Sequence, residues 1–173
     1  RLNTMKYLYA FLFFLSLNFH SKLAAQTLFK SFAFQMPLDA AKDLLTKESK
    51  ELKNLSFGGG TLYAVRKKSL VGKNGKLVSL NLGSKKNLNL NQAEAYLKKS
   101  RAYFESKNFK VVYAQENWSK PTLVKKNLPG IRFVDPDKTV VVEVDPRGQG
   151  SVYNVFITFY NYEWFLKKAR GEE

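Results

Sequence analysis

Apolar runs and polar turn residues are most clearly separated between Pro129 and Tyr160, where the sequence is PGIRFVDPDKTVVVEVDPRGQGSVYNVFITFY. Three runs rich in β-branched and aromatic residues are separated by clusters of Asp, Pro and Gly at residues 135–138 and 145–150. Such runs are typical of strands, and such clusters are typical of turns. The connections are too short to hold a crossover helix, so we expect three consecutive antiparallel strands.

A hairpin is predicted between residues 61 and 82. Its first expected strand begins with residues 62–65 and its second is 77–82; between them lies the dipeptide Asn74-Gly75, which is the strongest short hairpin signal. Basic residues at 66–68 fall inside the first strand, which indicates an edge or a solvated face. Further extended segments are expected at residues 27–36 and 109–113.

Two segments carry apolar residues at helical spacing. The first, 38–55, follows Pro37 and ends before glycines 58–60. The second begins at Asn91, which forms a capping-box pattern with Glu94, and ends at Asn108, which tolerates the left-handed conformation. Residues 161–169 fit one face of a strand and one face of a helix equally well.

This order of elements predicts an α+β fold. We expect a mainly antiparallel sheet, made of the hairpin and the C-terminal meander, with two helices packed on one face. The core residues expected beneath the helices are Leu97, Phe104, Val140, Val142, Val144, Val155, Ile157 and Phe159.

The N-terminus has the pattern of a secretory signal peptide. Lys6 precedes an apolar run at residues 7–19, and small residues at 24 and 25 suit cleavage after Ala25. The run is shorter than the roughly 20 residues of a membrane span, although an N-terminal anchor or a buried helix is the alternative. Residues 1–4 precede the first Met and either belong to the chain or lie upstream of the translated start. We therefore expect a signal peptide at 1–25 and a single domain at 26–173 without a transmembrane span.

Composition removes several classes of chemistry. The chain has no Cys, and its one His, His20, lies in the expected signal peptide. Thiolate metal sites, Cys nucleophiles and Ser-His-Asp arrangements are therefore excluded from the mature chain. Export without disulfides favours a bacterial periplasm or exterior over a eukaryotic secretory route. No catalytic residue, metal site or cofactor is predicted.

Carboxylates are the remaining candidates for catalysis. Asp135 and Asp137 share one predicted turn, while Glu143 and Asp145 share one face of a strand. A carboxylate-dependent hydrolase that uses Glu143 and Asp145 on an envelope or extracellular polymer is therefore the alternative function. The simpler interpretation of that pair is a solvated strand end beside Arg147.

Positive charge is concentrated in the middle of the chain. The formal net charge is +15, and 15 of the 29 Lys and Arg residues lie between positions 66 and 126, a stretch with three acidic residues. The excess indicates either a solvated lysine-rich surface or a face that meets anionic partners. The candidate anion-binding residues are Arg66, Lys68, Lys98, Lys99, Arg101, Lys125 and Lys126.

Two tryptophans are candidate aromatic contacts: Trp118 lies in a polar connector and Trp164 near the end of the chain. The sequence as a whole favours an exported, non-enzymatic envelope module with a basic face for anionic partners. Those partners would be a lipid headgroup, an acidic polysaccharide or an acidic protein. Nucleic acid is disfavoured, because the protein is expected to be exported and carries no recognisable nucleic-acid-binding motif.

Removal of the N-terminus is a direct test of export. Mass spectrometry of the protein isolated from its native envelope should show a chain that begins at or near Gln26. An intact N-terminus in the membrane pellet would instead identify residues 7–19 as an anchor.

Overall fold

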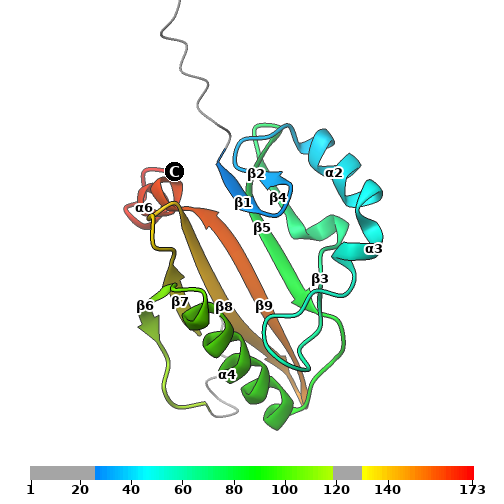
Figure 1. Cartoon of the computed structure of the whole chain (residues 1–173), viewed down its shortest axis with the longest axis vertical. Coiled ribbons are helices and arrows are strands. Elements are labelled where there is room, and N and C mark those ends of the chain that lie inside the picture. Colours follow the sequence, from blue (N-terminus) through cyan, green and yellow to red (C-terminus); the bar gives the residue numbers. More distant parts are fainter. Residues whose placement is uncertain (1–25, 119–129) are drawn as a thin grey trace, which may run out of the picture.

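The computed structural model describes residues 26–118 and 130–173. A seven-stranded antiparallel sheet runs through these residues in the order β3-β5-β9-β8-β7-β6, and β4 pairs with β5 beside β3 (Figure 1). The strands are β3 (Tyr63–Ala64), β4 (Leu70–Lys73), β5 (Lys76–Ser84), β6 (Lys110–Ala114), β7 (Ile131–Val134), β8 (Val140–Gln149) and β9 (Val152–Asn161). The predicted α+β class is confirmed.

The C-terminal meander β7–β8–β9 is confirmed, but its second turn is shorter than predicted. Residues 145–149 continue β8, and the turn is made by residues 150 and 151. Pro146 pairs with Val155 beyond the last pairing of β7 with β8, at Ile131 and Val144. Proline is tolerated there because, among the described residues, no strand pairs with this end of β8 on its β7 side.

The hairpin turn at Asn74-Gly75 is confirmed, with φ values of 51° and 72°. Both residues adopt the left-handed conformation that the tightest hairpin turns require. The first predicted strand is wrong, since it is divided into β3 and β4 by a 3₁₀ turn, η1 (Lys67–Ser69). In that turn the Ser69 hydroxyl oxygen accepts the backbone N–H of Arg66 at 2.8 Å.

The N-cap of the long helix α4 (Leu90–Ser106) lies two residues before the predicted one. Asn89, not Asn91, is the N-cap: its side chain accepts the N–H of Gln92, while the Gln92 side chain accepts the N–H of Asn89, each at 2.9 Å. Two backbone donors are satisfied in this way, as in any capping box. The predicted left-handed end at Asn108 is confirmed, with φ of 64°.

The N-terminal third is more divided than its hydrophobic pattern predicts. A two-stranded hairpin, β1 (Thr27–Phe29) and β2 (Phe32–Ala33), replaces the single extended segment. The predicted helix 38–55 is two helices, α2 (Leu38–Lys47) and α3 (Ser49–Leu52), separated at Glu48. Residues 161–169, for which the sequence pattern left strand and helix open, contain the helix α6 (Tyr162–Ala169). The backbone N–H of Trp164 donates to the Asn161 side chain at 2.8 Å.

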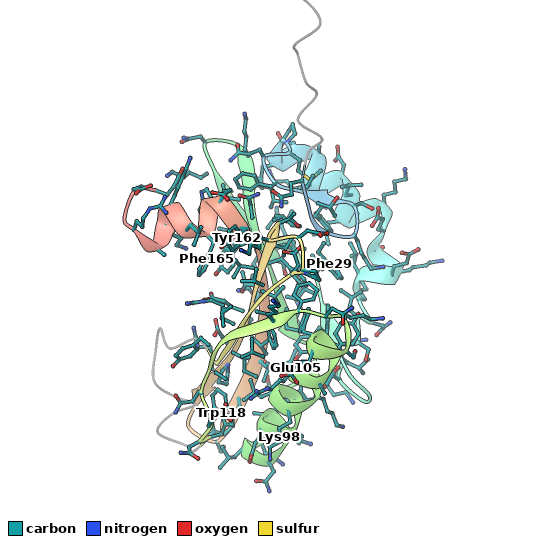
Figure 2. All side chains as sticks on the ribbon, turned by 60° about the vertical axis from the view of Figure 1, so that its left-hand side comes forward. Phe29, Lys98, Glu105, Trp118, Tyr162 and Phe165 are labelled. Atoms are coloured by element: carbon teal, nitrogen blue, oxygen red, sulfur yellow. The ribbon has the colours of Figure 1, made fainter. Side chains whose placement is uncertain are left out.

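One face of the sheet is covered by α4 and by the β1–β2 hairpin (Figure 1). Between these layers lies an aromatic cluster in which Phe57 contacts Phe29, Phe104 and Phe159. All eight predicted core residues are buried. The prediction of two helices on one face did not include α6, which packs on the opposite face. Phe165 of α6 contacts Tyr160 there, and Figure 2 shows Phe165 and Phe29 on opposite sides of the strands.

Truncation of the core should be costly. Phe104→Ala and Ile157→Ala remove side chains that are 2% and 0% exposed, so each should lower the free energy of unfolding by about 2–5 kcal/mol. Val112, which is 57% exposed, offers a control whose change to Ala should cost less than about 0.5 kcal/mol. Urea unfolding monitored by circular dichroism measures all three, and unmoved midpoints for both core variants would contradict this packing.

Candidate functional site

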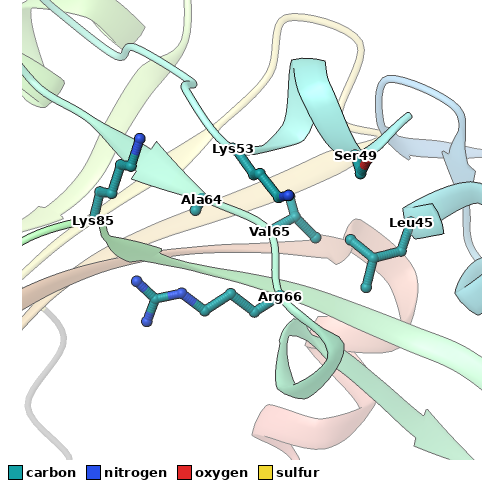
Figure 3. Close-up of a pocket in the computed structure, with 7 residues that line it drawn as sticks. All are labelled: Leu45, Ser49, Lys53, Ala64, Val65, Arg66 and Lys85. Atoms are coloured by element: carbon teal, nitrogen blue, oxygen red, sulfur yellow. The ribbon is translucent and has the colours of Figure 1, made fainter. Parts of the chain in front are cut away.

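A row of hollows follows the edge of the sheet at β3. The first has a volume of about 330 Å³ and is drawn in Figure 3. Its lining residues are Leu45, Ser49, Lys53, Ala64, Val65, Arg66 and Lys85. The second, of about 200 Å³, shares Arg66 with the first and is lined further by Lys68, Ser69, Asn81, Gly83 and Phe156. Arg66 therefore stands between two concave surfaces.

A third hollow, of about 280 Å³, lies between residues 86–88 and the first turns of α4. Lys86 and Lys99 line it, and the Lys99 ammonium is 3.5 Å from the point where a side chain on Gly60 would begin. Lys85 of the first hollow and Lys86 of the third are consecutive, so the three hollows follow one another. We call their six cations the basic edge: Lys53, Arg66, Lys68, Lys85, Lys86 and Lys99.

Backbone hydrogen bonds bring the segments of the basic edge together. The N–H of Val65 donates to Leu52 O at 2.9 Å, which fixes α3 beside the chain leaving β3. The N–H of Lys85 donates to Leu62 O at 2.8 Å, and the Lys85 ammonium donates to the Asn54 side chain. Cations just beyond the ends of α3, β3 and β5 are thus held around one hollow.

No acidic side chain neutralises the basic edge. All 14 Asp and Glu residues lie in the described part of the chain, and none comes within 4.0 Å of the six cations in an ion pair. None of the residues lining the three hollows is acidic either. Uncompensated like charges at one edge add their fields and raise the local concentration of anions.

Three of the predicted anion-binding residues, Arg66, Lys68 and Lys99, belong to the basic edge. Two others, Lys98 and Arg101 on α4, do not belong to it and form ion pairs. Lys98 pairs with Glu94 at 3.0 Å, and Arg101 pairs with Glu105 and Glu116 at 3.1 and 3.3 Å. Lys125 and Lys126 lie outside the described residues. Sequence reasoning missed Lys53, Lys85 and Lys86; the Lys85-Lys86 pair at the end of a strand was the only local signal.

The two candidate tryptophans are both engaged in packing. Trp164 is 8% exposed and stacks on Tyr160 with ring centroids 6.1 Å apart, while the Lys168 ammonium lies 5.2 Å from its ring. Trp118 is partly buried against the hydrophobic core and approaches Gly130 closely. A role of either residue in ligand contact stays a prediction.

The sequence suggested that Glu143 and Asp145 lie at a solvated strand end, and this interpretation is wrong. Each residue is 9% exposed, because β8 continues past both and they face the side of the sheet opposite α4. Arg132 donates from Nε and Nη2 to one Glu143 oxygen at 2.9 and 2.7 Å. The other carboxylate, Asp145, accepts the N–H of Gly130 at 2.9 Å and lies 3.6 Å from Arg147.

The environment of Asp145 disfavours its charged form. Burial, and then the neighbouring charge of Glu143, raise the pKa of Asp145 to about 6, although the Gly130 hydrogen bond, Arg147 and Arg132 oppose this shift. Burial likewise raises the pKa of Tyr160 on the same face. Perturbed carboxylates mark functional sites and structural networks alike. Arg132 holds the Glu143 carboxylate, and Gly130 and Arg147 hold that of Asp145.

The other motifs of the sequence have structural partners. Asp135 accepts bonds from Thr139 and Val140 and so stabilises the β7–β8 turn. A side chain at Gly58, where φ is 104°, would begin 2.6 Å from the Lys99 carbonyl oxygen, so this glycine permits close packing on α4. Within residues 26–118 and 130–173, no group of three or more acidic or His side chains is arranged to hold a metal ion.

No family model, curated protein or solved structure matches this chain. Among the described helices, none is both long and apolar enough to cross a membrane.

Replacement of Asp145 by Asn should stabilise the protein in a pH-dependent way. A pKa raised from 3.8 to about 6 means that Asp145 contributes stability at low pH, and that this contribution is lost as pH rises through that interval. Asp145→Asn keeps an oxygen acceptor for Gly130 and removes the charge. It should raise the free energy of unfolding at pH 7.5 by up to about 3 kcal/mol, with most of the gain absent at pH 4.

Urea unfolding at the two pH values measures this effect. Asp39→Asn is the control, because Lys42 lowers the pKa of that exposed carboxyl and its replacement should bring no gain at pH 7.5. An Asp145→Asn variant that is destabilised more at pH 7.5 than at pH 4 would show that the folded protein favours the charged carboxylate, which would contradict a raised pKa.

Proposed function

We propose that this protein is an exported, non-enzymatic module that binds an anionic component of the cell envelope through its basic edge. The proposal is carried by one observation. Six cations from α3, α4 and the chain around β3 and β5 surround three consecutive hollows, and no carboxylate of the described chain pairs with them. Such an edge favours association with anions over any single reaction chemistry.

The class of partner follows from the location we propose. The N-terminal signal pattern and the absence of Cys support a bacterial periplasmic or secreted protein. The anionic materials of that compartment are lipid headgroups, acidic polysaccharides and acidic proteins. Each cation close to an anionic membrane contributes about 1 kcal/mol of binding free energy, so six acting together are sufficient for a useful affinity without a deep cavity.

A carboxylate-dependent hydrolase is the less well supported alternative. The raised pKa of Asp145 suits a general acid, and Glu143 lies two residues away on the same face. Both carboxylates are nevertheless held by Arg132, Arg147 and Gly130 and are largely screened from solvent. The basic edge, by contrast, is exposed and uncompensated.

Binding to anionic vesicles tests the proposal. The purified protein should bind vesicles of anionic lipid at 0.01 M salt. This binding should weaken steeply by 0.15 M salt, because the Debye length falls from about 30 Å to about 8 Å. Neutral vesicles should not bind. The double reversal Arg66→Glu with Lys85→Glu should lower affinity for anionic vesicles at least about 30-fold, since each cation is worth about fivefold.

The matched control changes the net charge equally at the other edge of the sheet. Lys107→Glu with Lys110→Glu alters two exposed lysines beside and within β6, which lies at the far end of the strand order from β3. This variant should retain most of the binding. An equal loss in both variants would assign the binding to net charge, and equal binding to neutral and anionic vesicles would refute an electrostatic interaction.

A further inference from the structure

We infer that the first hollow, between α3 and β3, binds a small amphiphile: a phosphate monoester carried on a short apolar chain. The inference rests on the proposed function, because it assigns a ligand chemistry to one part of the basic edge. It also goes further, since vesicle binding by surface charge requires no hollow. Three properties of the hollow carry it: its apolar end, its cationic end and its size.

The apolar end is formed by residues of α2 and β3. Leu45 comes from α2, while Ala64 and Val65 are 5% and 3% exposed and form the floor. Figure 3 shows Leu45 and Ser49 at one end of the hollow and Arg66 and Lys85 at the other, with Ala64 and Val65 between them. A bare anion would leave the apolar end in contact with water, whereas an alkyl chain would cover it.

Three cationic side chains line the hollow: Arg66 and Lys85 lie at one end, and Lys53 reaches beside Val65 (Figure 3). Arg66 carries a planar fork of donors that suits phosphate oxygens, and Lys85 is oriented by its bond to Asn54. Lys53 completes the set from the end of α3. Because no acidic residue lines the hollow, these charges have no internal counterion.

The charge and number of donors favour phosphate over carboxylate. A phosphate monoester carries about −1.5 to −2 charges at neutral pH and three acceptor oxygens, whereas a carboxylate carries one charge and two oxygens. The volume of about 330 Å³ is at the lower end of the range for small-molecule sites, roughly 300–1,000 Å³. A short chain, not a complete two-chain lipid, therefore fits inside.

Four probes separate the contributions of head and tail. Isothermal titration calorimetry of the purified protein compares hexyl phosphate, inorganic phosphate, hexanoate and hexanol. Each buried CH₂ is worth about fourfold in affinity, so hexyl phosphate should bind at least about tenfold more tightly than inorganic phosphate. It should also bind more tightly than hexanoate, and hexanol should show no measurable binding.

A variant that fills the hollow keeps every charge. Ser49 lines the apolar end, is partly exposed and makes no side-chain hydrogen bond among the described residues, so Ser49→Phe should occupy the space. Hexyl phosphate affinity should fall at least about tenfold, to that of inorganic phosphate or below, while anionic-vesicle binding persists. Ser106→Phe, at the exposed end of α4, is the control that adds the same ring elsewhere and should change neither.

A direct measurement covers the case in which Ser49→Phe does not fold. In NMR titrations of the unmodified protein, the methyl signals of Leu45 and Val65 should shift with hexyl phosphate and not with inorganic phosphate. The inference is overturned if the two phosphates bind equally, if hexanoate binds as tightly as hexyl phosphate, or if the methyl signals do not respond.

The outcomes for the two proposals are distinguishable. If vesicle binding requires Arg66 and Lys85 but hexyl phosphate binds no better than inorganic phosphate, the proposed function stands and the amphiphile site is refuted. If hexyl phosphate binds as described but anionic and neutral vesicles do not differ, the envelope-binding function is refuted and the site remains.

Discussion

The structure depends above all on the burial of one apolar face of β8 and β9 against α4. Val142, Val144 and Ile157 are fully buried on that face, and Phe104 of α4 meets Phe159 of β9 within the aromatic cluster. Loss of water from this much apolar surface is the dominant favourable contribution to folding. It fixes the register of β8 on β9, because a slip of one residue would turn every apolar side chain to the other face.

That register decides what the opposite face can carry. Arg132, Glu143 and Asp145 alternate with the buried residues and so point away from α4. Their ion pair and hydrogen bonds satisfy groups that are largely screened from water, and the Arg132 guanidinium lies 4.8 Å from the ring of Phe165 on α6. The C-terminal helix and the polar face are therefore stabilised together, while the raised pKa of Asp145 records the cost of charge in that position.

The basic edge is a consequence of the same architecture. Some acidic residues form ion pairs with cations close to them in the sequence. On α4, Glu94 pairs with Lys98 and Glu105 pairs with Arg101. Such exposed pairs contribute little stability, but they leave a different set of cations uncompensated at β3. Charge concentrated on one strand edge, next to an apolar hollow, combines long-range attraction of anions with a place for an apolar group.

The amino-acid sequence by itself determined the features that depend on neighbours along the chain. Runs of β-branched and aromatic residues between turn clusters predicted β7–β9, helical spacing predicted the buried face of α4, and Asn74-Gly75 predicted the hairpin turn, since each pattern reflects local backbone preference and burial. The sequence did not reveal that the first helix breaks at Glu48, that β8 continues through residues 145–149, or that Asn89 caps α4. It also located only half of the basic edge. Lys53, Arg66 and Lys85 belong to separate segments of the chain. These segments are brought together by the pairing of β3 with β5 and by the hydrogen bond of Val65 to Leu52. Long-range pairing of this kind has no signature in any one segment, so the tertiary structure alone decided where the cations meet.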